Sequence, residues 1–332
     1  MTVRRSTGKR HIARALWYTG PGAAEVRTEM VRDCLPGEAR VRTLFSGISR
    51  GTERLISNGA VPPSEWQRMR APMQSGDFPF PVKYGYCATG VVEDGPPELT
   101  GKTIFCLHPH QDVFVASADR LAPVPEDVPA KRATLAANME TALNAHWDAE
   151  TGPGDRIVIV GAGVVGLLVA RIAARMPGTE VTVVDVDASR REITEQFGAR
   201  FTKPDAAPHD ADLVFHTSAS EAGLATGLQC AGFEATVVEL SWYGEAAPKV
   251  PLGGAFHSRR LTLKSSQVGH VAGPKRARWP YSRRLGTALE LLRDPVLDAL
   301  VADEIDFSEA PLRLPSILNG PATGFAPVIR YS

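Results

Sequence analysis

The glycine-rich turn at residues 161–166 constrains the fold more than any other feature of the chain. Its sequence is Gly-Ala-Gly-Val-Val-Gly, and it directly follows the apolar, β-branched run Arg-Ile-Val-Ile-Val at residues 156–160. A short run of this kind predicts a buried strand. Residues 165–176 are mostly apolar and end before Pro177-Gly178, so they predict a helix. A strand, a tight glycine turn and a helix in this order open a βαβ unit.

Further strands and helices alternate along the second half of the chain. The predicted strands are residues 180–184, 212–216, 235–241 and 261–265, and the predicted helices are residues 131–149, 189–197 and 283–292. This alternation favours a parallel sheet with helices on both faces, which is an α/β fold. Beyond residue 292 the pattern predicts irregular structure as far as Tyr331.

The first third of the chain has a different character. Residues 12–120 are rich in Val, Phe, Thr, Gly and Pro, and turn signals such as Leu35-Pro36-Gly37 separate short alternating runs. This pattern predicts a compact β-rich domain. The proline-rich stretch at residues 62–81 predicts a long irregular loop. A length of 332 residues suits two such domains.

Composition excludes several classes of protein. Lys plus Arg and Asp plus Glu number 37 each, and this balance argues against a nucleic-acid partner. The four cysteines form no CxxC pair, and no secretory signal is evident, which favours the cytoplasm. Residues 1–14 are basic without an apolar core and are interpreted as a solvated tail. The apolar stretch at residues 157–170 is too short to cross a bilayer, so we expect no membrane partner.

The glycines of the turn match the requirements of dinucleotide binding. Gly161 permits the tight turn, Gly163 lets the backbone approach a pyrophosphate, and Gly166 lets the helix pack close to the strand. Val164 and Val165 open the helix, whose N-terminal N–H groups and partial positive charge favour phosphates. The motif therefore predicts a dinucleotide site at residues 161–166.

Asp185 determines which dinucleotide we expect. It lies 19 residues after Gly166, at the end of the next predicted strand. A carboxylate there accepts hydrogen bonds from ribose hydroxyls and repels a 2′-phosphate, which predicts NAD. NADP is the alternative, because Arg190 and Arg191 would host the phosphate if Asp185 turned aside. Asp187 beside them weakens that alternative.

The order of these parts resembles the medium-chain dehydrogenase/reductase family over essentially the whole chain. The resemblance implies a GroES-like catalytic domain at residues 1–122 and a Rossmann dinucleotide-binding domain at residues 123–262. It further implies a C-terminal return at residues 263–332 that completes the sheet and the catalytic domain. The implied activity is that of an NAD(P)-dependent, alcohol dehydrogenase-like oxidoreductase with a small-molecule substrate. Relatives are commonly dimers or tetramers, so we expect a homodimer.

Zinc-dependent members of that family hold their catalytic metal with three side chains, and all three positions differ here. By resemblance, Ser49 replaces the ligand cysteine, Tyr86 replaces the ligand histidine, and Ala137 replaces the second cysteine. Ser and Tyr are poor zinc ligands, so we expect no zinc. A cysteine tetrad for a structural zinc is also missing from the sequence. The alternative is a rebuilt metal site formed by Glu53, Cys87, His108 and Glu140.

Four runs are similar to a branch without zinc that includes the bacteriochlorophyllide hydroxyethyl dehydrogenases. These runs are residues 45–53, 81–90, 107–110 and 135–142. No residue in the chain argues for a tetrapyrrole, so the branch does not assign the substrate.

Without a metal, a side chain must exchange the proton of the reacting oxygen. Tyr86 is the first candidate, because the resemblance places it where the ligand histidine would point into the cleft. Lys83 would lower the pKa of Tyr86 if the two side chains approach each other. Ser49 would orient a substrate hydroxyl. His108 and His110 are further candidates, because imidazoles relay protons near neutral pH.

Four more residues complete the expected cofactor site. Arg50 matches a position that contacts the pyrophosphate in relatives, and Thr141 matches a position near the nicotinamide. Ser241 and Trp242 follow a predicted strand, and open α/β sheets bind ligands beyond the carboxyl ends of their strands.

The leading hypothesis is a zinc-independent, NAD(H)-dependent oxidoreductase that interconverts an alcohol and a ketone or aldehyde. The first alternative is an NADPH-dependent reductase of an enone or quinone, which Ser49 and Tyr86 also permit. The second alternative is a protein that binds NAD(H) as a sensor without catalysis.

Overall fold

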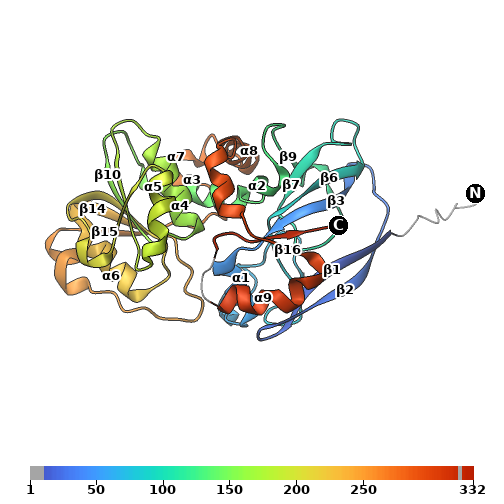
Figure 1. The fold of residues 1–332 in the computed structure, drawn as a ribbon, viewed down its shortest axis with the longest axis horizontal. Coiled ribbons are helices and arrows are strands. Elements are labelled where there is room, and N and C mark those ends of the chain that lie inside the picture. The colour runs from blue at the N-terminus through green and yellow to red at the C-terminus, as the bar shows by residue number, and fades with distance from the viewer. Residues whose placement is uncertain (1–10, 321–323) are drawn as a thin grey trace, which may run out of the picture. The chain divides into compact units, whose positions relative to one another are not determined.

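The computed structural model describes residues 11–320 and 324–332, so most of the basic tail predicted at residues 1–14 lies outside the described residues. The chain divides into two compact units (Figure 1). The first unit comprises Met1–Ala137 and Leu300–Ser332, and the second comprises Asn138–Ala299. The domain boundaries given above at residues 122 and 262 stay predictions.

The second unit is built on a parallel sheet, which confirms the predicted α/β class. Its strands are β10 (Arg156–Val160), β11 (Glu180–Val184), β12 (Arg200–Thr202), β13 (Ala211–His216), β14 (Ala231–Glu239) and β15 (Thr262–Ser265). They lie in the order β12-β11-β10-β13-β14-β15, and each neighbouring pair is parallel. The chain runs outward from β10 through β12 and then returns to β13 beside β10. Such a reversal leaves a crevice at the carboxyl ends of these two strands, where open α/β sheets bind ligands.

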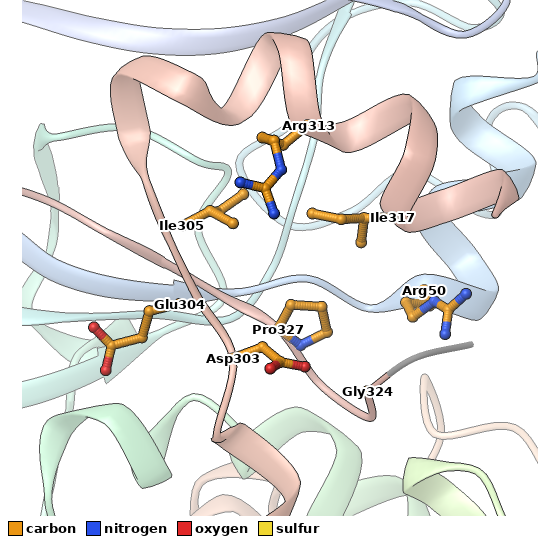
Figure 2. A pocket seen from close by; sticks show the side chains of 8 residues that line it. All are labelled: Arg50, Asp303, Glu304, Ile305, Arg313, Ile317, Gly324 and Pro327. Carbon is orange, nitrogen blue, oxygen red and sulfur yellow. The ribbon is translucent and has the colours of Figure 1, made fainter. Parts of the chain in front are cut away.

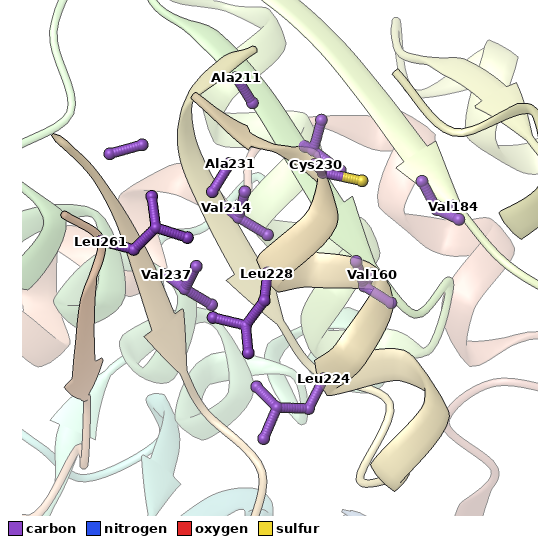
Figure 3. Packing of buried hydrophobic residues seen from close by; sticks show 12 residues of the cluster. Val160, Val184, Ala211, Val214, Leu224, Leu228, Cys230, Ala231, Val237 and Leu261 are labelled. Carbon is purple, nitrogen blue, oxygen red and sulfur yellow. The ribbon is translucent and has the colours of Figure 1, made fainter. Parts of the chain in front are cut away.

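The second unit also contains helices, several of which pack against these strands (Figure 1). They are α3 (Ala136–Ala149), α4 (Val164–Ala174), α5 (Arg191–Gln196), α6 (Glu221–Cys230), α7 (Gly273–Arg276) and α8 (Tyr281–Leu291). Helix α6 lies against β10, β13 and β14. Figure 3 shows Leu224 and Leu228 of this helix among Val160, Val214 and Val237 of the strands. Each of these residues is almost fully buried, and burial of one such side chain stabilises the fold by roughly 1.5–3 kcal/mol.

The first unit is mostly β-structure, as the sequence predicts. One sheet has the order β2-β1-β5-β4, and another has the order β16-β17-β3-β6-β7-β9, with β8 paired to β3. The strands are β1 (His11–Gly20), β2 (Ala23–Val31), β3 (Glu38–Gly47), β4 (Ser75–Gly76), β5 (Val82–Lys83), β6 (Ala88–Asp94), β7 (Thr103–Cys106), β8 (Val113–Ser117), β9 (Ala122–Pro123), β16 (Glu304–Asp306) and β17 (Val328–Arg330). The helices are α1 (Arg50–Ser57), α2 (Ala130–Ala133) and α9 (Ala310–Asn319).

Short turns of 3-10 helix link these elements. They are η1 (Pro63–Glu65), η2 (Ala118–Arg120), η3 (Ala188–Arg190), η4 (Pro204–Ala206), η6 (Pro295–Val301) and η7 (Phe307–Glu309). The segment η5 (Leu252–Phe256) is kinked at Gly254, whose backbone angles are not helical. Across the part of the chain that the structure describes, no helix combines the length and apolarity needed to cross a membrane.

Two expectations about local structure are wrong. The helix predicted at residues 131–149 is two helices, because the chain turns at Thr134, whose Oγ1 donates to the carbonyl of Lys131. The region after residue 292 is ordered rather than irregular. It contains α9, and β17 pairs with β3, which lies some 280 residues earlier in the chain. The pairing is non-local, and β17 is only three residues long, so the sequence shows no alternation of apolar and polar residues that would predict it.

Candidate active site

The glycine turn is tight at Gly161 and Gly166 and open at Gly163. Gly161 adopts φ +111°, a left-handed conformation that a side chain disfavours. A Cβ atom on Gly166 would overlap the carbonyl oxygen of Gly161, so α4 packs against the turn only with glycine there. A Cβ atom on Gly163 would meet nothing within 4 Å, so this position is open. Val164 begins α4, and Val165 follows in its first turn, where helical N–H groups lack partners in their own helix.

Asp185 lies beside this turn, at the carboxyl end of β11. Its Oδ2 accepts a 2.6 Å hydrogen bond from the backbone N–H of Ala162, and its Oδ1 accepts one of 2.9 Å from Asp187. The side chain is half-buried. These bonds fix the carboxylate next to the glycine turn and leave lone pairs for further donors.

The two predicted arginines have defined partners. Arg190 is buried, and its Nε lies 3.2 Å from Oδ2 of Asp187. Arg50 opens α1 in the first unit, and its guanidinium donates a 3.2 Å hydrogen bond to the carbonyl of Gly320. Figure 2 shows Arg50 at one end of a pocket that Asp303, Ile317 and other residues line.

The remaining cofactor candidates lie in the second unit. Thr141 is half-buried on α3. Ser241 and Trp242 follow β14, as expected, and both are half-buried. Oγ of Ser241 accepts a 3.0 Å hydrogen bond from the backbone of Ala219, which fixes the chain after β14 to the chain after β13.

Tyr86 and Ser49 form the hydroxyl pair of the first unit. The Tyr86 hydroxyl donates a 2.5 Å hydrogen bond to Oγ of Ser49 and lies 3.2 Å from Oγ1 of Thr52. Burial raises the pKa of Tyr86 well above its ordinary value, so the phenol stays protonated at neutral pH. Gly85, with φ +119°, turns the chain immediately before Tyr86.

Lys83 is not among the groups that shift the pKa of Tyr86, although the sequence suggested that it would lower this pKa. Its ammonium lies 2.6 Å from Oε2 of Glu29 and 2.8 Å from Oε1 of Gln111. No influence of Lys83 on the pKa of Tyr86 is found, and that pKa moves upward rather than downward. The physical reason is that burial outweighs the other contributions at Tyr86.

His110 belongs to a buried network behind this pair. Its Nε2 lies 3.0 Å from Oε2 of Glu53, and its Nδ1 lies 2.7 Å from Oγ of Ser46. Ser46 is also 2.8 Å from the hydroxyl of Tyr331. The other oxygen of Glu53 accepts a 2.7 Å hydrogen bond from the backbone N–H of Ser49. The network therefore holds Ser49 in place from behind.

His108 has different surroundings from His110. Its ring stacks on Phe114, with 3.8 Å between ring centroids, and its Nδ1 is 2.9 Å from the carbonyl of Pro109. The side chain is buried, and burial lowers the pKa of His108 to about 3. The imidazole is therefore neutral near pH 7 and packed as a core ring.

The residues at the three family zinc positions do not fit a zinc ion. Ser49 and Tyr86 offer protonated hydroxyls that are hydrogen-bonded to each other, and Ala137 offers no ligand atom. The alternative ligands are also engaged elsewhere, since Glu53 binds His110 and Glu140 binds Arg284 at 3.0 Å. Residues 11–320 and 324–332 contain no group of three or more His, Cys, Asp or Glu side chains arranged to hold a metal.

Sequence reasoning missed two sets of polar residues. The sequence analysis gives Glu53 only as an alternative metal ligand. A carboxylate four residues after Ser49 is also a signal that its side chain hydrogen-bonds the backbone there. His216 and Glu239 were not considered. Each is the last residue of a strand and directly follows two or more apolar residues, which is a signal that the sequence contains. The two strands are neighbours in the sheet.

Known proteins that resemble this chain in sequence include a family model and several dehydrogenases. Residues 149–241 match the family model of the alanine dehydrogenase/PNT C-terminal domain. D-guloside 3-dehydrogenase of Escherichia coli K12 is 24% identical over 325 residues, which cover 88% of this chain and 92% of the relative. The 2-desacetyl-2-hydroxyethyl bacteriochlorophyllide A dehydrogenase of Cereibacter sphaeroides is 29% identical over 210 residues, with 55% and 59% coverage.

A solved structure has the same fold over nearly the whole chain. L-Idonate 5-dehydrogenase from Escherichia coli superposes with a TM-score of 0.79 at 15% identity, covering 98% of this chain and 100% of that one. The likeness shows the predicted combination of a Rossmann domain with a GroES-like domain. From the glycine turn, the fold and these relatives, the chain resembles the zinc-type alcohol dehydrogenase-like medium-chain dehydrogenase/reductase superfamily and is an alcohol dehydrogenase-like oxidoreductase.

Proposed function

We propose that this enzyme is a zinc-independent, NAD(H)-dependent dehydrogenase that interconverts a secondary alcohol and a ketone on a polyhydroxylated small molecule. The observation that carries the proposal is the hydrogen bond between Tyr86 and Ser49. The resemblance assigns both residues to positions where zinc-dependent relatives hold metal ligands. The guloside dehydrogenase likeness supports the substrate class.

The choice of NAD rests on the charge beside the glycine turn. Asp185 is fixed there by its bonds to Ala162 and Asp187, and a 2′-phosphate would meet its negative charge. Arg190, the candidate phosphate partner, is buried against Asp187. The bound nicotinamide supplies the hydride acceptor or donor.

The proton step falls to the hydroxyl pair. Tyr86 donates its proton to Oγ of Ser49, which leaves the hydroxyl hydrogen of Ser49 for the substrate oxygen. Because burial raises the pKa of Tyr86, the phenol stays protonated at neutral pH and offers a hydrogen-bond donor rather than a standing base. Glu53 supports this step by holding the backbone N–H of Ser49. His110 acts through Glu53, as a positioning residue.

The remaining proposals concern the state of the protein. We propose a cytoplasmic location. In its support, Cys34, Cys87, Cys106 and Cys230 form no disulfide within the residues that the structure describes. A homodimer stays a prediction, and the molar mass in solution at micromolar concentration tests it.

The activity is tested with purified protein and a panel of polyols, sugar alcohols, glycosides, enones and quinones. We expect reduction of NAD by members of the first three groups, with activity kept after dialysis against a chelator. Turnover only of enones or quinones with NADPH would replace the proposal by a reductase. Tight binding of NAD(H) without any turnover would replace it by a sensor.

A further inference from the structure

A long stretch of the second unit carries positive charge without any acidic residue. Residues 246–289 contain nine Lys and Arg side chains and no Asp or Glu, although the whole chain is balanced at 37 of each kind. The proposed dehydrogenase reaction uses none of these charges. Four of them lie on α7, at the start of α8 and in the turn between the two helices (Figure 1). They are Lys275, Arg276, Arg278 and Arg283, and we call this set the basic face.

The charges of the basic face are not neutralised by carboxylates of the protein. Its three arginines are exposed, its lysine is half-buried, and none of the four forms an ion pair within residues 11–320 and 324–332. Most other exposed arginines do pair with a carboxylate, as Arg156 does with Asp210 at 2.8 Å and Arg330 does with Asp306 at 2.7 Å. A local excess of one charge attracts a partner of the opposite charge.

Two arginines of the basic face are held in place by contacts that do not cancel their charge. Nε of Arg276 donates a 3.1 Å hydrogen bond to the carbonyl of Val271. The guanidinium of Arg283 donates one of 3.3 Å to the carbonyl of Arg278 and lies over the ring of Trp279, 3.8 Å from the ring centroid. Side chains that are ordered before binding lose less conformational entropy when a partner binds, which favours the complex.

Aromatic side chains support the basic face from below and beside it. The ring of Trp279 packs on that of Trp147 in α3, with 4.6 Å between the ring centroids. Pro280, which fixes its own φ angle, joins Trp279 to the first residue of α8. That residue is Tyr281, which is 55% exposed and whose hydroxyl donates a 2.9 Å hydrogen bond to the carbonyl of Gly269. The basic face therefore combines fixed arginines with tryptophan and tyrosine.

This chemistry matches carboxylates that another protein presents. The arginine guanidinium is always charged, and its planar fork of donors binds a carboxylate in bidentate geometry. Arginine, tryptophan and tyrosine are also the residues enriched in the hot spots of protein–protein interfaces. We propose that the basic face docks an acidic segment of a partner protein, whose Asp and Glu side chains bind Arg276, Arg278 and Arg283.

The same contacts disfavour other anionic partners. Single-stranded nucleic acid stacks its bases on free aromatic faces, whereas Trp279 has Arg283 over its ring and Trp147 packed against it. Attraction to an anionic membrane is diffuse and does not require guanidinium groups in fixed orientations. A second copy of this chain, docked symmetrically through the same face, would bring an equal positive charge to the contact.

Titration of the full-length protein with a fluorescently labelled poly-L-glutamate peptide tests the docking surface. We expect saturable binding that weakens at high salt, because exposed charges are screened there. The triple variant Arg276→Gln/Arg278→Gln/Arg283→Gln should weaken binding by about ten-fold or more, since it removes three guanidinium–carboxylate pairs. Binding should also change the tryptophan emission, and Trp279→Phe should remove most of that change, because Arg283 lies over this ring.

Lys102→Gln/Arg120→Gln/Lys203→Gln is the matched control, because it removes the same charge from exposed side chains elsewhere on the protein. It should bind the peptide as the unchanged protein does, and melting curves check that both triple variants fold. No saturable binding, or equal weakening by the two triple variants, would overturn the proposal. Tighter binding of duplex DNA or of phosphatidylglycerol vesicles, lost in the first triple variant, would replace the acidic protein by that partner. A lower molar mass of the first triple variant alone would replace it by a second copy of this chain.

Discussion

Nε2 of His110 lies 3.0 Å from Oε2 of Glu53, and neither side chain is reached by solvent. Glu53 accepts three hydrogen bonds from this enclosure, from His110, from Tyr18 and from the backbone of Ser49. The Tyr18 hydroxyl and the Ser49 N–H donate to this carboxyl group, and His110 also donates when its Nε2 carries the hydrogen. The pair thus links the core of the first unit to the hydroxyl pair above it.

Replacing Glu53 by Gln should lower the stability of the protein strongly. The amide presents one acceptor and one donor to three donors, and breaking a buried pair typically costs about 3–5 kcal/mol. Urea unfolding measures this loss. Glu25→Gln is the control, because Glu25 pairs with Arg27 on the surface and should cost less than about 1 kcal/mol. Equal effects of the two substitutions would contradict the anchoring role of Glu53.

Tyr86→Phe should lower turnover by about 10²–10⁴-fold, because it removes the proposed proton donor. The affinity for NAD(H) should stay nearly unchanged, as fluorescence titration can show. Tyr84→Phe is the matched control, since Tyr84 is the buried neighbour whose ring meets that of Tyr86 edge-on. If Tyr86→Phe is fully active, the proton donor must be sought elsewhere.

Asp185→Ser should raise the use of NADP relative to NAD. The substitution removes the charge beside the glycine turn, and a hydrogen bond to a charged group contributes about 1.5–3 kcal/mol. NAD binding should therefore weaken roughly ten-fold or more. The ratio of kcat/KM for the two cofactors reports the change, and an unaltered ratio would mean that Asp185 does not face the ribose.

Two alanine substitutions in the glycine turn should fail in different ways. Gly166→Ala should unfold or distort α4, because the new Cβ would overlap the carbonyl of Gly161. Gly163→Ala should fold normally, because its Cβ meets nothing within 4 Å, but it should bind NAD(H) more weakly, since this position is where the pyrophosphate approaches. Melting temperature and cofactor titration separate the two effects.

Acid should begin to destabilise the protein near pH 6.5, above the range where carboxylates titrate. Burial lowers the pKa of His108 to about 3 and that of His146 to about 4. Between these values and about 6.5 the unfolded chain binds protons that the folded chain does not, so stability falls as pH falls. Each histidine adds a slope of about 1.4 kcal/mol per pH unit in this window. His108→Gln should reduce the slope measured by urea unfolding between pH 5 and pH 6, and an unchanged slope would contradict its buried neutral state.

The sequence alone determined the α/β unit and its dinucleotide turn. The reason is that these features are local: β-branched runs, helix-forming segments and the spacing of Gly161, Gly163 and Gly166 act over a few residues. The same applies to Asp185, whose place at a strand end follows from the run before it. The resemblance to a known family then identified Ser49 and Tyr86 as the residues at the former metal positions.

Only the tertiary structure decided how the polar groups are paired. His108 and His110 are close in sequence but have different partners. His108 stacks on Phe114, whereas His110 contacts Glu53, which lies 57 residues earlier. The pairing of β17 with β3 and the contact between His216 and Glu239 likewise join segments that are distant in sequence. Sequence patterns report burial and period along one element, whereas hydrogen-bond partners, and the pKa shifts that burial produces, depend on which elements the fold brings together.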